Sequence, residues 1–142
     1  MKTKEHMIEF IKKQKVAFIA SIDEDGFPTM KAMFAPRKIE GNFFYFSTNL
    51  SSMRAKHFMK NPKASIYFYN KGRFKYEGLM LSGTMEVLQD DKIKKEIWCT
   101  GDTLYYRQGV TDPDYCVLKF TAVKGRHYCD LKTKSFDISD LT

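Results

Sequence analysis

The sequence contains few of the residues from which metal and catalytic sites are usually built. Its three histidines are far apart (His6, His57 and His127), and its three cysteines form no C-x-x-C pair (Cys99, Cys116 and Cys129). No H-E-x-x-H, G-x-S-x-G or G-x-G-x-x-G motif occurs. A metal site, a serine-hydrolase elbow and a Rossmann dinucleotide site are therefore not expected. If the protein performs redox or group-transfer chemistry, a bound cofactor must supply the reactive centre.

Long apolar runs are absent as well. No segment approaches the roughly 20 apolar residues that cross a bilayer as a helix. The run 16–20 is too short for the core of a signal peptide, and the acidic residues 23–25 follow it closely. The cysteines are odd in number and widely spaced, which is typical of reduced thiols. We therefore expect a cytoplasmic protein that does not enter a membrane.

Aromatic residues and positive charge are plentiful. The 142 residues include 12 Phe and 8 Tyr, mostly in short alternating runs, and this pattern favours a sheet-rich fold. The length predicts a single domain over 1–142. Some aromatic side chains should face a ligand or a second subunit. The net charge of +7 suits an anionic partner such as a phosphate, a nucleotide cofactor or nucleic acid.

Hydrophobic periodicity predicts a mostly β, α+β fold with six or seven antiparallel strands and a few short helices. Helices are expected over 3–14, with Thr3 as the cap, from 51 or 52 to 60, and over 90–98. Gly78 and Gly83 indicate bends or bulges in the sheet. The predicted strands cover 16–22, 28–37, 43–47, 64–69, 75–89, 115–122 and 126–131, with the last two joined near Lys124 and Gly125.

The segment 43–61, FFYFSTNLSSMRAKHFMKN, is the most informative part of the chain. It predicts a strand, a polar turn and then a helix capped by Ser51 or Ser52 and ended by Asn61-Pro62. Free N–H groups at the helix start, together with nearby hydroxyls and cations, would form a cradle for a phosphate (Thr48, Ser51, Ser52, Arg54 and Lys56). Lys31, in the middle of strand 28–37, could lie on the same side. Alternatively, the serine only caps the helix and the cations lie on a solvated face.

Several motifs, taken in order, resemble a known family. They are D-G-F-P-T-M-K-A-M, F-Y-F-S-T-N-L-S-S-M-R-A-K followed by N-P-K-A-S-I-Y-F, S-G-T-M-E-V before D-D-K-I-K-K-E-I-W, and D-P-D-Y-C-V-L-K-F. From about Met7 to Ile138 the chain resembles the FMN-binding split barrels of the pyridoxamine 5′-phosphate oxidase type. Within them it is similar to the small group related to general stress protein 26.

This resemblance implies a split β-barrel and a homodimer with FMN at the subunit interface. By match to the family motifs, the flavin phosphate would be held by Lys31, Ser52 and Arg54, with Lys56 as a nearby candidate. The ring and the ribityl chain would border four further residues (Ala32, Met33, Ser47 and Thr48). Lys31 stands where arginine is usual, so the charge is kept but the bidentate fork is lost. Met53-Arg54 replaces the Arg-Lys pair of the oxidases, and their substrate-binding tail has no match, so pyridoxamine phosphate oxidation is not expected.

Two classes of function follow. The first is a flavin-dependent oxidoreductase with a small-molecule electron donor and acceptor, in which no side chain is assigned as a general acid or base. The second is a binding module without catalysis, which would hold flavin or another anionic cofactor, such as deazaflavin or haem, for storage or sensing. Binding of single-stranded nucleic acid is a weaker version of the second class, because the aromatic residues lie in apolar strand runs.

Overall fold

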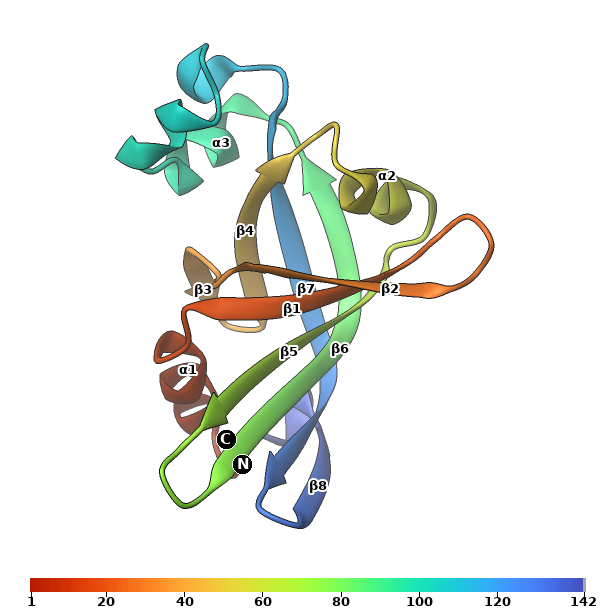
Figure 1. Cartoon of the computed structure of the whole chain (residues 1–142), viewed down its shortest axis with the longest axis vertical. Helices are drawn as coiled ribbons and strands as arrows, with labels where there is room; N and C mark the ends of the chain where they lie inside the picture. The colour runs from red at the N-terminus through yellow and green to blue at the C-terminus, as the bar shows by residue number, and fades with distance from the viewer. Residues whose placement is uncertain (142) are drawn as a thin grey trace.

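The computed structural model describes residues 1–141, which form an eight-stranded antiparallel sheet with three α-helices (Figure 1). The helices are α1 (Lys4–Lys12), α2 (Met53–Lys60) and α3 (Asp91–Ile97). The strands are β1 (Val16–Ile22), β2 (Pro28–Phe34), β3 (Lys38–Glu40), β4 (Phe43–Asn49), β5 (Lys63–Lys71), β6 (Tyr76–Leu88), β7 (Tyr115–Cys129) and β8 (Lys132–Asp137). Their order is β2-β1-β5-β6-β7-β4-β3, and β8 pairs with β7. Three short 3₁₀ helices complete the described elements, η1 (Thr100–Leu104), η2 (Gly109–Thr111) and η3 (Ile138–Asp140).

The predicted fold class is confirmed, but the strand count and the predicted division near Gly125 need correction. The segment predicted as two strands joined near Gly125 is one strand of 15 residues, β7. Gly125 does not turn the chain; an added Cβ there would lie 2.5 Å from the Phe136 ring, so glycine permits close packing inside the sheet. The turn comes later, at Asp130 with φ of 56°, and leads into β8, which was not predicted. The three-residue strand β3 is too short to give a sequence pattern.

The core fills the curl of the sheet, and α1 covers one end of it. Alternate side chains of the strands point inward and are almost fully buried, among them Phe44, Phe68 and Leu81. Met7, Phe10 and Ile11 of α1 pack onto this core, and Thr3 Oγ1 accepts a hydrogen bond from His6 N at 3.2 Å. The predicted helix and its Thr3 cap are both confirmed. None of the helices formed by residues 1–141 is long and apolar enough to span a bilayer.

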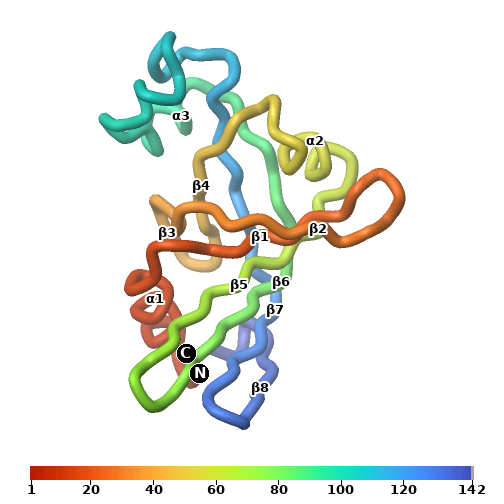
Figure 2. The backbone as a smooth tube through the Cα atoms, in the orientation of Figure 1, coloured from red at the N-terminus to blue at the C-terminus, as the bar shows by residue number. Residues whose placement is uncertain are grey.

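A β-bulge helps the sheet to curl. The β6–β7 register shifts between Ser82 and Gly83, as the glycine pattern predicted. A Cβ on Gly83 would lie 1.9 Å from the Thr121 carbonyl oxygen, so only glycine allows this approach. Bulges bend a strand and increase its twist. As a result the β1–β2 pair crosses β4 without pairing with it, and the barrel stays open between β2 and β4 (Figures 1 and 2).

Candidate functional site

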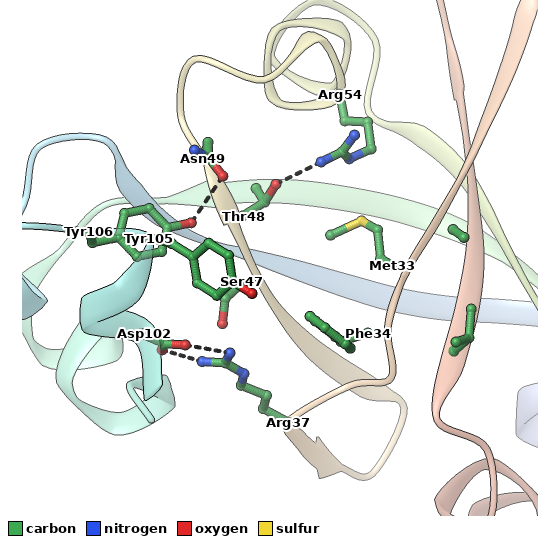
Figure 3. Close-up of a pocket in the computed structure, with 12 residues that line it drawn as sticks. Met33, Phe34, Arg37, Ser47, Thr48, Asn49, Arg54, Asp102, Tyr105 and Tyr106 are labelled. Atoms are coloured by element: carbon green, nitrogen blue, oxygen red, sulfur yellow. Dashed lines mark hydrogen bonds and ion pairs between the residues drawn. The ribbon is translucent and has the colours of Figure 1, made fainter. Parts of the chain in front are cut away.

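Two adjoining hollows occupy the opening between β2 and β4. The β4 hollow has a volume of about 390 Å³ and the α2 hollow about 560 Å³, within the range of about 300–1,000 Å³ usual for ligand pockets. Asn49 and Arg54 line both. The β4 hollow is otherwise lined by Val16, Ala32, Met33, Phe34, Arg37, Ser47, Thr48, Asp102, Tyr105 and Tyr106 (Figure 3). The α2 hollow is otherwise lined by Ile19, Thr29, Met30, Lys31, Ser51, Ser52, Met53 and His57.

The start of α2 forms one wall of the α2 hollow. Ser52 is the N-cap, and its Oγ accepts a hydrogen bond from Ala55 N at 3.2 Å. Ser51, the alternative cap, is engaged elsewhere, because its N–H and hydroxyl both donate to the Asp114 carboxylate at 2.8 and 3.1 Å. Since Ser52 only accepts in its cap bond, its own hydroxyl proton remains available to a ligand oxygen. Of the two serines expected in the cradle, Ser52 therefore faces it with a usable donor.

Arg54 has charge and donors that the protein itself leaves unmatched. One guanidinium nitrogen, Nη2, donates to Thr48 Oγ1 at 3.1 Å (Figure 3). Its Nε is buried and has no hydrogen-bond partner among residues 1–141, and no carboxylate in that range forms an ion pair with it. Burial lowers the pKa of the Arg54 guanidinium, because no nearby acid compensates for lost hydration. A half-buried, unpaired guanidinium is suited to binding an anion.

Lys31 lies across the α2 hollow from this helix. It pairs in register with Ile19, which is buried, so both residues are on the side of the β1–β2 ribbon that faces α2. Lys31, Ser52 and Arg54 thus meet at one hollow, although Lys31 is far from the other two in sequence. Lys56 is not brought to them. It lines a separate hollow with Asp23, Glu24 and Lys60 on another side of α2.

The other four predicted site residues all line the β4 hollow. Ala32 and Met33 come from β2, and Ser47 and Thr48 come from β4. Thr48 is only 4% exposed and accepts the hydrogen bond from Arg54. The Ser47 hydroxyl is buried and has no hydrogen-bond partner among residues 1–141. A buried hydroxyl without a partner is costly, so it is a position at which a ligand group would complete the bonding.

An ion pair that the sequence did not reveal forms the far wall of the β4 hollow. Arg37 donates to both oxygens of Asp102, at 2.5 and 2.7 Å, and Asp102 also accepts from Cys99 N at 3.0 Å (Figure 3). Burial of Asp102 opposes its ionisation, but these hydrogen bonds outweigh burial and lower its pKa. The same contact raises the pKa of Arg37. The pair anchors η1 against the chain that leads into β3.

Two tyrosines complete the β4 hollow. Tyr106 is buried, its ring packs tilted against the rings of Tyr115 and Trp98, and its hydroxyl donates to Asn49 Oδ1 at 3.2 Å. Burial raises its pKa. Tyr105 remains 68% exposed beside the hollow. In sequence the only signal was an aromatic pair in an irregular segment, and no spacing rule places such a pair opposite β4.

The donor set fits an elongated ligand with an anionic group at one end and a planar group at the other. Cations and a free hydroxyl line the α2 hollow, whereas the β4 hollow combines apolar and aromatic walls with a few polar atoms. Such a division matches FMN, whose phosphate and ring differ in the same way. Among residues 1–141 no group of three or more His, Cys, Asp or Glu side chains could hold a metal ion. Cys116 is buried beside the site, and burial raises its pKa to about 12, so its thiol is not a nucleophile.

Known proteins resemble this chain in sequence and in fold. The family model described as pyridoxamine 5′-phosphate oxidase matches residues 3–129. A solved Clostridium acetobutylicum protein is 36% identical with a TM-score of 0.85 and covers 97% of this chain and 96% of its own; it is described as related to general stress protein 26 of Bacillus subtilis, in the pyridoxine phosphate oxidase family.

Two more distant structures share the fold. General stress protein 26 from Bacillus anthracis has 16% identity and a TM-score of 0.75, covering 94% of this chain and 97% of its own. A haem-binding protein from Mycobacterium smegmatis has 14% identity and a TM-score of 0.75, covering 92% and 56%. No curated protein matches the sequence significantly. The family match and the Clostridium relative together show that this chain belongs to the pyridoxamine 5′-phosphate oxidase family.

Proposed function

We propose that the protein binds FMN across the two hollows and acts as a flavin-dependent oxidoreductase. The observation that carries the proposal is Arg54, a half-buried cation without an ionic partner among residues 1–141, which faces Lys31 and Ser52. A phosphate monoester would accept charged hydrogen bonds from Arg54 and Lys31 and a neutral one from Ser52. The start of α2 adds free N–H groups and the positive end of its dipole.

The β4 hollow would hold the ring and the ribityl chain. Met33 and Phe34 offer apolar surface, and the backbone of Ala32 and Met33 lies along the same edge strand. Ser47, whose hydroxyl lacks a partner, and Thr48 provide polar atoms next to that surface. When bound, FMN supplies transfer of electrons between a donor and an acceptor. The chain itself binds and orients the cofactor and supplies positive charge at its anionic end.

No side chain is assigned as a general acid or base. Asp102 is held by Arg37 and Cys99, and the Tyr106 hydroxyl is held by Asn49. The pKa of Asp102 is lowered and that of Tyr106 is raised, so both groups keep the same protonation state around neutral pH. Such groups are poor general acids or bases. The resting forms here are the ionised carboxylate and the neutral phenol. This favours direct transfer to and from the cofactor, and it also supports a second candidate, a flavin carrier that does not turn over.

We also propose that a second copy of the chain covers the open side of the β4 hollow. The outer face of the sheet carries exposed apolar side chains, which continue from β2 across β1 to β5 and β6: Val16, Phe18, Met30, Phe34, Tyr69 and Tyr76. Val16 and Phe34 also line the β4 hollow, so this face adjoins the site. Contiguous exposed apolar surface of this kind typically marks an interface.

The proposal is tested by titrating the purified protein with FMN. Binding should quench FMN fluorescence and saturate at one FMN per chain, and the complex should sediment as a dimer. Bleaching of the bound flavin by NADH or NADPH without oxygen, followed by recovery with an acceptor, would show oxidoreductase activity. FMN binding without reduction by any donor would exclude the oxidoreductase and support the flavin carrier. Failure to quench FMN at micromolar protein would refute both.

A further inference from the structure

A buried chain of hydrogen bonds links α2 to the β1–β2 ribbon beside the α2 hollow. His57 lies one turn after Arg54 and is 7% exposed, and Ser21 of β1 is 2% exposed. His57 Nδ1 is 3.0 Å from Ser21 Oγ, and Ser21 Oγ is 2.8 Å from Thr29 Oγ1. Thr29 in turn donates its hydroxyl to the Ser21 carbonyl oxygen at 3.3 Å. No motif in the sequence indicated this cluster.

One arrangement of these bonds places the proton of the neutral imidazole on Nδ1. When Thr29 gives its hydroxyl proton to the Ser21 carbonyl oxygen, Ser21 supplies the proton of the Ser21–Thr29 bond. Ser21 Oγ is then the acceptor for His57, so the neutral ring carries its proton on Nδ1. The other nitrogen, Nε2, is bare in that form. It has no hydrogen-bond partner among residues 1–141.

His57 lines the α2 hollow together with Lys31 and Arg54. A bare Nε2 repels a phosphate oxygen, whereas the protonated ring offers an N–H donor and a positive charge. Protonation therefore changes the hollow from two fixed cations to three. Resting on the proposed function, we propose that His57 is a proton-dependent contact of the phosphate site. As the imidazolium it binds a phosphate monoester, and it releases this contact when neutral.

Charged groups face His57 from both sides of α2. Lys31 of β2 and Arg54 of α2 face it across the α2 hollow, and four charges face it from the other side of α2 and from the β1–β2 turn: Asp23, Glu24, Lys56 and Lys60. Carboxylates, lysines and arginines ordinarily keep their charge between about pH 5.5 and 8, where histidine changes its charge. The phosphate gains charge over the same range, with a second ionisation near about pH 6, and this acts in the opposite direction. The ionisation of the phosphate affects wild type and a variant without the imidazole equally, so the ratio of their affinities reports on His57 alone.

The first test measures the dissociation constant of FMN at several pH values for the wild type and for His57→Gln. At pH 5.5 the variant should bind FMN about tenfold more weakly than wild type, which corresponds to the weakest charged hydrogen bonds. The ratio of the two dissociation constants should fall toward one by about pH 8.5. Riboflavin, which has no phosphate, should show no such ratio. Ser21→Ala releases Nδ1, lets the neutral ring donate from Nε2, and should flatten the pH dependence. A ratio that is constant with pH would overturn the proposal and leave FMN binding intact.

A second measurement titrates the wild-type protein and needs no variant at His57. The His57 ring signal in NMR, assigned by elimination with His6→Gln and His127→Gln, is titrated with and without inorganic phosphate. Linkage requires a tenfold affinity difference to appear as an upward shift of about one pH unit in the His57 midpoint. An unshifted midpoint at saturating phosphate would refute the contact. A shifted midpoint in a protein that does not bind FMN would support the anion contact while the proposed function fails.

Discussion

Replacing Arg54 by methionine separates the binding role of this residue from a structural one. The guanidinium makes one internal hydrogen bond, to Thr48, and has no ionic partner among residues 1–141. Without a ligand its burial is therefore largely uncompensated, and methionine keeps much of its volume and is a good helix former. We expect the free energy of unfolding of the FMN-free variant to stay within about 1 kcal/mol of wild type.

FMN binding should respond very differently. A charged hydrogen bond to phosphate contributes about 1.5 to 3 kcal/mol, which corresponds to a dissociation constant about 10- to 150-fold higher. Fluorescence titration gives this constant directly. As an independent check, added FMN should raise the melting temperature of the variant less than that of wild type. Riboflavin affinity should be nearly unchanged, because the lost contact is to the phosphate.

Lys60→Met is the matched control, because it removes the same charge from the same helix. Lys60 is exposed at the end of α2 and forms a long surface ion pair with Glu24 at 3.6 Å. Its replacement should change FMN affinity by less than about twofold, as expected for a screened surface charge. Equal losses in the two variants would mean that net charge alone attracts the ligand. An Arg54→Met protein that binds FMN like wild type would refute the assignment of the phosphate to this hollow.

Three further predictions concern the walls of the site. Asp102→Asn should lower the free energy of unfolding by about 3 kcal/mol in urea titrations, because it leaves the half-buried charge of Arg37 without its partner. The pKa of Asp102 is lowered in the folded state, so its contribution to stability is present above about pH 4 and is lost as the pH falls through the folded value. The free energies of unfolding of wild type and variant should therefore converge in acid. A difference that stays constant with pH would contradict this. Ser52→Ala should cost about 1 kcal/mol of stability through the lost cap and also weaken FMN binding, whereas loss of stability alone would show that Ser52 only caps. Phe18→Lys should give a monomer by sedimentation and weaken FMN binding with it, while a variant that stays dimeric would place the interface elsewhere.

Local pattern in the sequence determined the elements around the site. The polar turn after the aromatic run predicted a capped helix from Ser52, and the alternation in 28–34 placed Lys31 and Met33 on one face of a strand. These signals are reliable because a cap bond and a two-residue period each depend on near neighbours in the chain. The glycine pattern also gave the bulge at Gly83, since a missing side chain in a strand usually marks close approach of another backbone.

Contacts between distant segments were decided only by the tertiary structure. The curl of the sheet brings Lys31 to Arg54, brings Arg37 to Asp102, and sets Tyr106 against Asn49, pairs that no short-range spacing encodes. The separation of Lys56 from Arg54 has a local cause, because side chains two positions apart on a helix point about 200° from one another. The sequence by itself thus determined that a strand, a cap and cations could bind an anion. Which cations share the hollow, and what lies opposite them, depended on how far the sheet bends to bring β2 toward β4.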